Sequence, residues 1–255
     1  MTDTVSLSVT AGVATITLRR PDRLNALDVC TRHALLDTLT EVASDEDARV
    51  VVLTGTGRAF CVGQDLAAVE ELERAEETVA GTYNPIAQLL SEMPQVVIGA
   101  VNGLAVGAGL GLTLACDLRI AARSASFSCA FSKVALVPDT SVSWHLVREL
   151  GHARAMELAL SSRALSASEA LAMGLLNEVV ADEDLVLRVG ELADTLASGP
   201  ALSQRLTKRA FRSAPTMTLA ESLALEARHQ GQAARHPDHV EGRTAFTEKR
   251  PARFS

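Results

Sequence analysis

The amino-acid sequence predicts an α/β fold with a helical C-terminal part. Val50–Thr54 and Val96–Val101 are continuous apolar stretches, which is typical of strands buried on both faces of a parallel sheet. Such runs alternate with helical segments up to about residue 180, and only helical spacing of apolar residues follows. The 255 residues suit one large domain, or one domain with an appendage, and 47% of them are hydrophobic, enough for a sizeable core.

Local signals define the first elements. Val5–Val9 and Val13–Leu18 are apolar runs on either side of Ala11-Gly12, and this arrangement predicts a β-hairpin. Asp28 precedes a helical pattern that extends through Leu39, and an aspartate in that place can cap the first turn.

Later elements follow the same alternation until helices take over. Between the two buried strands, Val69–Val79 carries five glutamates, which predicts a helix with a solvated face. The remaining predicted elements are, in chain order, a helix at Pro85–Ser91, a helix at Ala108–Ala115, a strand at Leu118–Ala121, an apolar piece at Ser126–Phe131, helices at Ser143–Leu150, Ala153–Leu160 and Ser168–Met173, a short strand at Glu178–Val180, and helices from Asp182 onward.

Composition excludes several function classes. A net charge of −7 and an aromatic content of 3% argue against a nucleic-acid-binding surface. No apolar run reaches the roughly 18 residues of a membrane span without a glycine interruption, and Met1–Ala11 lacks the order of a secretory signal. We therefore expect a cytoplasmic protein that binds neither nucleic acid nor membrane. The four cysteines and six histidines lack metal-ligand spacing, so we expect no metal and no disulfide framework.

The most informative segment is Val96–Ala115, in which an apolar strand leads through a glycine-rich turn into an apolar helix. Backbone N–H groups and the positive helix end would converge at this turn, where they could stabilise an anion. The spacing matches neither a P-loop nor the dinucleotide-binding fingerprint. Tight packing of strand on helix, without a ligand, explains the glycines equally well at this point.

Seven motifs in order resemble the crotonase, or enoyl-CoA hydratase/isomerase, superfamily. Each motif is weak by itself, but their ordered combination spans the chain from its first strands to its last residues. The matching segments are Arg20–Leu27, Ala59–Leu66, Ala100–Gly109, Cys116–Leu118, Leu136–Asp139, Ala172–Leu175 and Phe246–Arg250.

This resemblance implies a crotonase-like spiral of ββα units. The core would comprise residues 1–195, and a helical region at residues 196–255 would form a homotrimer or a dimer of trimers. Members bind acyl-CoA and stabilise a thioester enolate with two backbone N–H groups, which by position are those of Gln64 and Ala108. Coenzyme A would arrive as part of the substrate, with no permanently bound cofactor.

The resemblance also implies the residues that border CoA. A phosphate would meet Arg58, and Phe246 with Lys249 would close over CoA, often from a neighbouring subunit; plain surface charge is the alternative for Arg58 and Lys249. The implied CoA-binding set is Arg23, Leu24, Ala26, Arg58, Asp65, Leu66, Phe246 and Lys249. Glu70–Tyr83 is expected to border the acyl pocket.

The departures from the family pattern bear on the reaction. Hydratases hold a catalytic water with two glutamates, and the corresponding positions here are Gly111 and Phe131. Neither side chain can transfer a proton, so hydration by two carboxylates is disfavoured. We expect Gly111, Phe131, Leu136 and Trp144 to line the substrate pocket instead.

One carboxylate, Asp139, follows Pro138 in a loop where Leu136, Val137 and Trp144 are expected to surround it and raise its pKa. The alternative is that Asp139 only caps the following helix. Ala130–Asp139 and two later segments resemble the ring-1,2-epoxyphenylacetyl-CoA isomerases of the family, which carry an aspartate at this position.

These residues favour an acyl-CoA isomerase that uses Asp139 as acid and base. Two alternatives stay open: a hydratase- or lyase-like enzyme with an unusual base, and a non-catalytic acyl-CoA-binding protein. His145 has no Ser or Cys partner in the sequence, so we expect it to serve packing or to lie at the surface.

Overall fold

The computed structural model describes residues 4–67 and 74–255, and its strands form two sheets. The larger sheet has the order β1-β2-β3-β5-β7-β10, and only its first pair, β1 with β2, is antiparallel. Its strands are β1 (Val5–Thr10), β2 (Val13–Leu18), β3 (Val50–Gly55), β5 (Val96–Val101), β7 (Leu118–Ala122) and β10 (Glu178–Val180). The predicted hairpin is therefore confirmed.

A second, four-stranded sheet was not predicted. Its order is β4-β6-β8-β9, with β4 at Ala59–Cys61, β6 at Leu104–Val106, β8 at Ser126–Ser128 and β9 at Leu165–Ser166. Three successive units place their first strand (β3, β5, β7) in the large sheet and their second (β4, β6, β8) in the small one. Strands of two or three residues are too short for any periodicity, which is why the sequence revealed only the long sheet.

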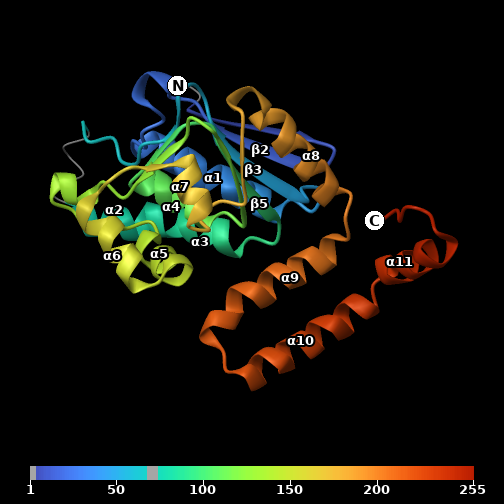
Figure 1. Ribbon diagram of the computed structural model, residues 1–255. Coiled ribbons are helices and arrows are strands. Elements are labelled where there is room, and N and C mark those ends of the chain that lie inside the picture. The colour runs from blue at the N-terminus through green and yellow to red at the C-terminus, as the bar shows by residue number, and fades with distance from the viewer. Residues whose placement is uncertain (1–3, 68–73) are drawn as a thin grey trace.

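Helices surround the large sheet and then continue alone (Figure 1). They are α1 (Val29–Ser44), α2 (Ala75–Thr78), α3 (Asn84–Glu92), α4 (Ala108–Ala115), α5 (Val142–Leu150), α6 (His152–Ser161), α7 (Ala167–Ala172), α8 (Leu185–Ala197), α9 (Ala201–Ser213), α10 (Leu219–Ala234) and α11 (Pro237–Glu248). A π-helical turn at Val79–Tyr83 joins α2 to α3.

The expectations for the helices are met with two qualifications. Asp28 caps α1, since its carboxylate accepts a hydrogen bond from the Thr31 amide at 2.8 Å, and the helix continues past Leu39 to Ser44. Part of the glutamate-rich helix expected at Val69–Val79 lies outside the described residues, and the described part is α2 with the π-helical turn.

Residues of β3 explain why the long strands are continuously apolar. Val51 and Leu53 point into the main core, whereas Val50 and Val52 belong to a second core beneath α8. Successive side chains on a strand face opposite sides, so a sheet covered on both faces needs an apolar residue at every position.

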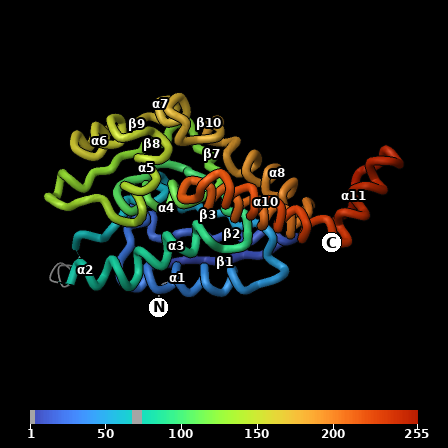
Figure 2. The backbone as a smooth tube through the Cα atoms, turned by 90° about the horizontal axis from the view of Figure 1, so that it is seen from below, coloured from blue at the N-terminus to red at the C-terminus, as the bar shows by residue number. Residues whose placement is uncertain are grey.

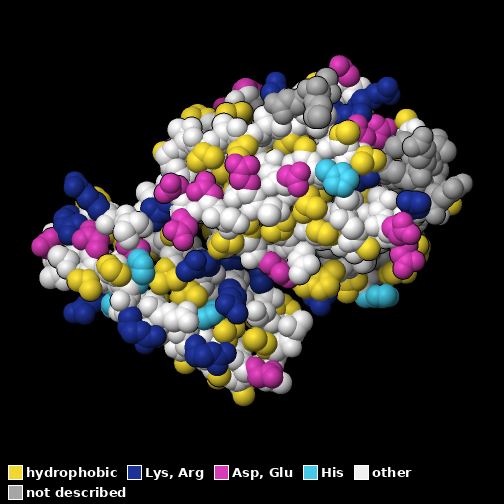
Figure 3. Space-filling view, turned by 180° about the vertical axis from the view of Figure 1, so that it is seen from behind, with side chains coloured by type: hydrophobic (Ala, Val, Ile, Leu, Met, Phe, Trp, Pro, Cys, Tyr) yellow, Lys and Arg dark blue, Asp and Glu magenta, His cyan; other side chains and the backbone are white. Residues whose placement is uncertain are grey.

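The C-terminal helices α9, α10 and α11 extend away from the body of the molecule in Figure 1, and α11 stands clear of the body in Figure 2 as well. Many Lys and Arg side chains gather over this part, as the dark blue atoms of Figure 3 show. The division into a core of residues 1–195 and a region of residues 196–255 stays a prediction; α8 ends at Ala197 and α9 begins at Ala201. No helix within residues 4–67 and 74–255 is long and apolar enough to cross a membrane.

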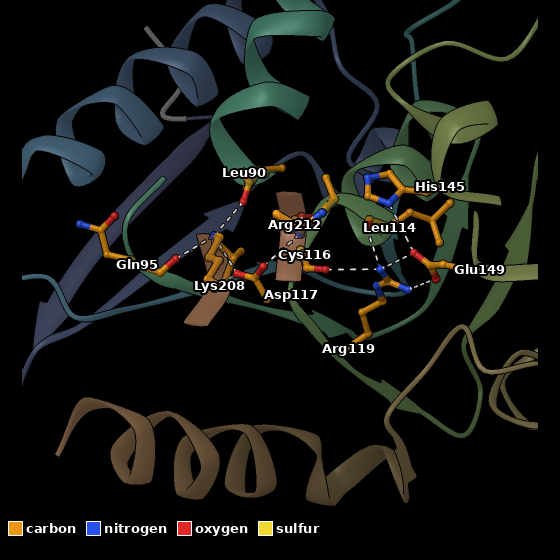
Figure 4. A network of polar contacts seen from close by, with 12 residues as sticks. Leu90, Gln95, Leu114, Cys116, Asp117, Arg119, His145, Glu149, Lys208 and Arg212 are labelled. Carbon is orange, nitrogen blue, oxygen red and sulfur yellow. Dashed lines mark hydrogen bonds and ion pairs between the residues drawn. The ribbon is translucent and has the colours of Figure 1, made fainter. Parts of the chain in front are cut away.

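A buried ion-pair cluster attaches α9 to the body (Figure 4). The Asp117 carboxylate, which follows α4, lies 2.7 Å from Lys208 Nζ and 3.0 Å from Arg212 Nη2. Lys208 also donates to the Gln95 carbonyl at 2.8 Å, and burial lowers its pKa despite the nearby Asp117 carboxylate. Asp117 in turn accepts a hydrogen bond from the Val97 amide on β5 at 2.9 Å.

We predict that Asp117→Ala lowers the free energy of unfolding by about 3 kcal/mol or more, because it leaves Lys208 buried without its carboxylate. Urea unfolding followed by circular dichroism, at one fixed protein concentration, measures the change. Glu157→Ala, which breaks an exposed pair with Arg163, should leave the unfolding free energy nearly unchanged. Equal effects of the two substitutions would contradict the anchoring role of Asp117.

Candidate active site

Two glycine turns meet at the end of the small sheet. Gly63 follows β4 and Gly107 follows β6, with φ of +85° and +57°, conformations that favour glycine. A Cβ atom on Gly63 would lie only 3.1 Å from the amide nitrogen of Ala108. The parallel pairing of β4 with β6 therefore brings together the turns that precede Gln64 and Ala108.

The direction of the Gln64 amide follows from its pairing with Leu27. The Leu27 amide donates to the Gly63 carbonyl at 2.8 Å, and its carbonyl accepts from the Asp65 amide at 3.1 Å. Amides alternate sides along an extended chain, so the N–H of Gln64 faces away from Leu27, toward the side on which β6 pairs. The Gln64 N–H would need this direction to donate to an oxygen atom held between Gln64 and Ala108.

Ala108 is the first residue of α4, so its amide N–H has no acceptor within the helix. Its side chain is only 4% exposed, and every residue of α4 is buried. The positive end of the helix dipole adds to the attraction for negative charge at this point.

Gly111 lies one turn along α4 from Ala108, on the same helix face. A Cβ at Gly111 would stand 2.8 Å from Thr140 Cβ, and closer still to the Thr140 carbonyl oxygen. The position where hydratases carry a glutamate is thus filled by the backbone of a neighbouring loop. Phe131, at the other glutamate position, is 7% exposed, and its ring tip would be 3.9 Å from a Cβ on Gly107.

The carboxyl group of Asp139 lies in the loop that packs on Gly111. Burial raises its pKa, and the hydroxyl of Thr140, which donates to Oδ1 at 2.7 Å, opposes that rise. The N-cap position of α5 belongs to Ser141, and only the backbone carbonyl of Asp139 bonds to this helix, through the Val142 amide at 2.9 Å. The described contacts therefore do not support the helix-capping alternative.

The expectation that Leu136, Val137 and Trp144 surround the Asp139 carboxylate stays a prediction; these residues are 41%, 79% and 39% exposed. The predicted direction of the pKa shift is correct, and the next residue, Thr140, packs against Gly111 of α4. Thr140 and Ser141 hold left-handed conformations with φ of +47° and +62°, strained for residues other than glycine.

His145 is buried, as expected for a packing role. It is 3% exposed, its ring lies edge-on to Trp144 with centroids 4.7 Å apart, and its Nδ1 is 3.3 Å from Glu149 Oε1. Burial lowers the pKa of His145, although Glu149 opposes this, so the imidazole is neutral at pH 7. Glu149 also binds Arg119, as Figure 4 shows.

The residues expected to border CoA are dispersed. Arg23, Leu24, Ala26, Asp65 and Leu66 lie on the two segments joined by the Leu27–Gln64 bridge, next to the turn at Gly63. Arg23 and Arg58 are exposed, but the Asp65 carboxylate already binds Arg20 Nη2 at 3.0 Å.

Phe246 and Lys249 stand apart from that group. Phe246 is 87% exposed on α11, and Lys249 caps the end of that helix. Helix α11 lies well away from α4 in both Figure 1 and Figure 2, so within one chain these two residues do not approach the turns.

Motif reasoning missed Arg32 and Tyr83, which are 2% and 1% exposed. A signal for Arg32 was available: it lies three residues before Leu35 and seven before Leu39, on the core-facing side of α1. Tyr83 gave no such signal, because its burial depends on the π-helical turn. Within the described residues, no group of three or more His, Cys, Asp or Glu side chains is arranged to hold a metal ion.

Successive ββα units spread over two sheets, with paired glycine turns at a helix N-terminus, define a protein of the crotonase class. The chain belongs to the enoyl-CoA hydratase/isomerase family, whose model matches residues 8–255. This confirms the resemblance drawn from the seven motifs. Enzymes of this family act on CoA thioesters.

Individual relatives cover nearly the whole chain. A 1,2-epoxyphenylacetyl-CoA isomerase of Escherichia coli K12 is 44% identical over 252 residues, which cover 97% of this chain and 96% of the relative. A protein of Rhodobacter capsulatus named probable enoyl-CoA hydratase is 43% identical over 254 residues, 99% of this chain and 98% of its own. The crystal structure of an enoyl-CoA hydratase from Bacillus anthracis has a TM-score of 0.94 at 34% identity and covers 98% of each chain.

We predict that Gly111→Ala destabilises the protein by about 1–3 kcal/mol, because its methyl group would overlap Thr140. Gly190 on α8 has open space around its Cβ position, so Gly190→Ala should instead stabilise by about 0.5–1 kcal/mol through helix propensity. Chemical denaturation of both variants checks the difference in sign. If Gly111→Ala were as stable as Gly190→Ala, the packing of the Asp139 loop on α4 would be disproved.

Asp139→Asn should make the protein more stable than wild type at neutral pH. A carboxyl with a raised folded-state pKa loses stability as the pH rises from its ordinary value of 3.8 through the raised value. Asparagine carries no charge to desolvate, so the difference should vanish below pH 3.8. Denaturation midpoints across this range, with exposed Asp194→Asn as the control, measure the effect. A pH-independent difference would contradict it.

Proposed function

We propose that the protein is an acyl-CoA isomerase that moves a double bond, or rearranges a ring, through an enolate. One observation carries this proposal. The desolvated carboxyl of Asp139 belongs to the loop that packs on Gly111. This packing leaves no room for a glutamate side chain at position 111. The name of the Escherichia coli relative, an isomerase, supports the same assignment.

In the proposed mechanism, the thioester oxygen lies between the amides of Gln64 and Ala108. Negative charge develops on that oxygen when a proton leaves the neighbouring carbon, and each donor is worth about 3–4 kcal/mol in such sites. The closeness of Gly63 to the Ala108 nitrogen, and the free end of α4, favour this arrangement. The implied CoA-bordering residues next to Gln64 would hold the nucleotide part of the substrate.

Asp139 acts as base and then as acid. With a 3-enoyl-CoA, its carboxylate takes a proton from C2, and the electron pair moves through the carbonyl carbon to the thioester oxygen. The carboxylic acid then returns the proton to C4, which gives the 2-enoyl-CoA without any net change in atoms or electrons. A raised pKa suits this exchange, because the protonated form of the group is then more accessible than that of an ordinary aspartate.

The assembly belongs to the proposal as well. Because Phe246 and Lys249 lie far from the turns of their own chain, they would close over CoA bound to a neighbouring subunit in a trimer or a dimer of trimers. Exposed apolar side chains on α9 and α10, at Phe211, Leu219 and Leu223, favour burial of these helices between subunits.

We predict that Asp139→Asn lowers the turnover of 3-hexenoyl-CoA by at least about 100-fold, because the base is lost. In the wild type, turnover should rise with pH through the raised pKa of Asp139, above its ordinary value of 3.8. Conversion is followed by the absorbance of the conjugated product, and Asp194→Asn serves as the exposed control. Turnover of Asp139→Asn near the wild-type rate would disprove this mechanism.

Proton exchange distinguishes the alternatives. In heavy water, the isomerase should place deuterium at C2 of a saturated acyl-CoA or at C4 of the product. A hydratase- or lyase-like enzyme, the activity suggested by the name of the Rhodobacter capsulatus relative, would incorporate solvent oxygen into the product instead. Tight thioester binding with no exchange would identify a non-catalytic binding protein.

A further inference from the structure

A buried cation, Arg32, contacts both Leu27, which pairs with the Gln64 turn, and Tyr83. It is 2% exposed and belongs to the core-facing side of α1, where the residues that follow at helical spacing are leucines. Arginine is almost never fully buried unless it is paired, because removal of its charge from water costs several kcal/mol. Contacts within the protein must therefore offset the free-energy cost of burying the Arg32 guanidinium.

One contact of Arg32 reaches the backbone beside Gln64. Its Nη1 atom donates to the Leu27 carbonyl at 3.1 Å. That same carbonyl accepts from the Asp65 amide at 3.1 Å, and the Leu27 amide donates to the Gly63 carbonyl at 2.8 Å. Arg32 thus holds the residue that pairs with both neighbours of Gln64.

A further contact of Arg32 reaches Tyr83. Its Nη1 atom lies 3.3 Å from Tyr83 Oη, and its guanidinium carbon lies 5.0 Å from the centre of the tyrosine ring. Because Arg32 donates to Oη, the hydroxyl proton of Tyr83 must point elsewhere. Tyr83 ends the π-helical turn Val79–Tyr83, a conformation that is frequent at functional sites.

The segment that carries Tyr83 lies beside the loop of Asp139, because Asn84, the next residue, and Ser141 line the same cavity. Burial is the largest cause of the raised pKa of the Tyr83 hydroxyl, which is therefore neutral at pH 7, and the Asp139 and Cys61 side chains raise it further while Arg32 opposes the rise. Tyr83 and Cys61, which lies on β4, belong to the same buried core cluster.

We propose that Arg32 is a positioning residue for the reaction: it holds the Gln64 turn and Tyr83 in place, so that Asp139 faces C2 of the acyl group while the thioester oxygen lies between the amides of Gln64 and Ala108. The proposal rests on the proposed isomerase function. In this proposal Arg32 acts through Leu27 and Tyr83, the groups to which its Nη1 atom donates.

Kinetic constants give the first test. Arg32→Met keeps an apolar stem but removes the hydrogen bonds to Leu27 and Tyr83. We therefore expect kcat for 3-hexenoyl-CoA to fall about 10- to 100-fold while KM changes little, as expected for misaligned reacting groups. Arg32→Lys, which can restore one hydrogen bond, should recover part of kcat. Tyr83→Phe should lower kcat with the same near-constant KM.

Gln95→Met is the matched control. Gln95 is 5% exposed, and its side chain donates to the Val42 and Asp45 carbonyls at 2.9 and 3.3 Å, near the opposite end of α1. It should lose comparable stability and keep kcat. If Arg32→Met, Arg32→Lys and Tyr83→Phe all kept kcat as Gln95→Met does, the positioning role would be overturned. Should Arg32→Met fail to fold, kcat of the other two variants decides the outcome.

A second measurement does not depend on turnover. Tyr83 is the single tyrosine of the chain, so 3-fluorotyrosine labelling gives one ¹⁹F resonance. That resonance should shift when hexanoyl-CoA is added, and it should also shift in the Asp139→Asn variant. The shift caused by hexanoyl-CoA should be lost in Arg32→Lys but kept in Gln95→Met. A resonance insensitive to both changes would overturn the placement of Tyr83 beside the site.

The two proposals can fail separately. If the wild type does not convert 3-hexenoyl-CoA but the ¹⁹F resonance responds as described, the isomerase function fails and Arg32 still positions an acyl-CoA site. If the wild type is an isomerase and the variants match the control, the function stands and the role of Arg32 fails.

Discussion

The candidate site depends on two glycines of α4, Gly109 and Gly111, against which other segments pack closely. A Cβ at Gly109 would stand 2.9 Å from Cys61 Cβ and closer still to the Cys61 backbone, and a Cβ at Gly111 would overlap Thr140. Because glycine removes these clashes, α4 packs against β4 on one face and against the Asp139 loop on another. The turns at Gly63 and Gly107 and the loop that carries Asp139 therefore all pack on α4.

The charges around α4 agree with this geometry. At its C-terminal end, Arg119 donates to the Leu114 carbonyl at 2.7 Å and Arg212 donates to the Ala115 carbonyl at 2.8 Å. Cations at a helix C-terminus complement the helix dipole, so the negative end of α4 is compensated within the protein. Arg212 comes from α9, so the same contact joins the C-terminal helices to the body (Figure 4).

Local pattern was sufficient for the long elements and insufficient for the short ones. The hairpin, the Asp28 cap and helix α4 follow from periodicity and capping within about ten residues. The second sheet does not, because β4 and β6 have three residues each and are strands only through their partners. The exposure of Leu136 and Trp144 was likewise beyond local pattern, since it depends on how the loop lies against α4.

The sequence by itself determined the family, the order of the long strands and helices, and the loss of both glutamates at Gly111 and Phe131. These are properties of single positions or short windows. Only the tertiary structure decided that Thr140 fills the space at Gly111, and that the Asp139 carboxylate accepts from Thr140 instead of capping α5. Such outcomes depend on packing between distant segments, and no local pattern of residues encodes the distance between them.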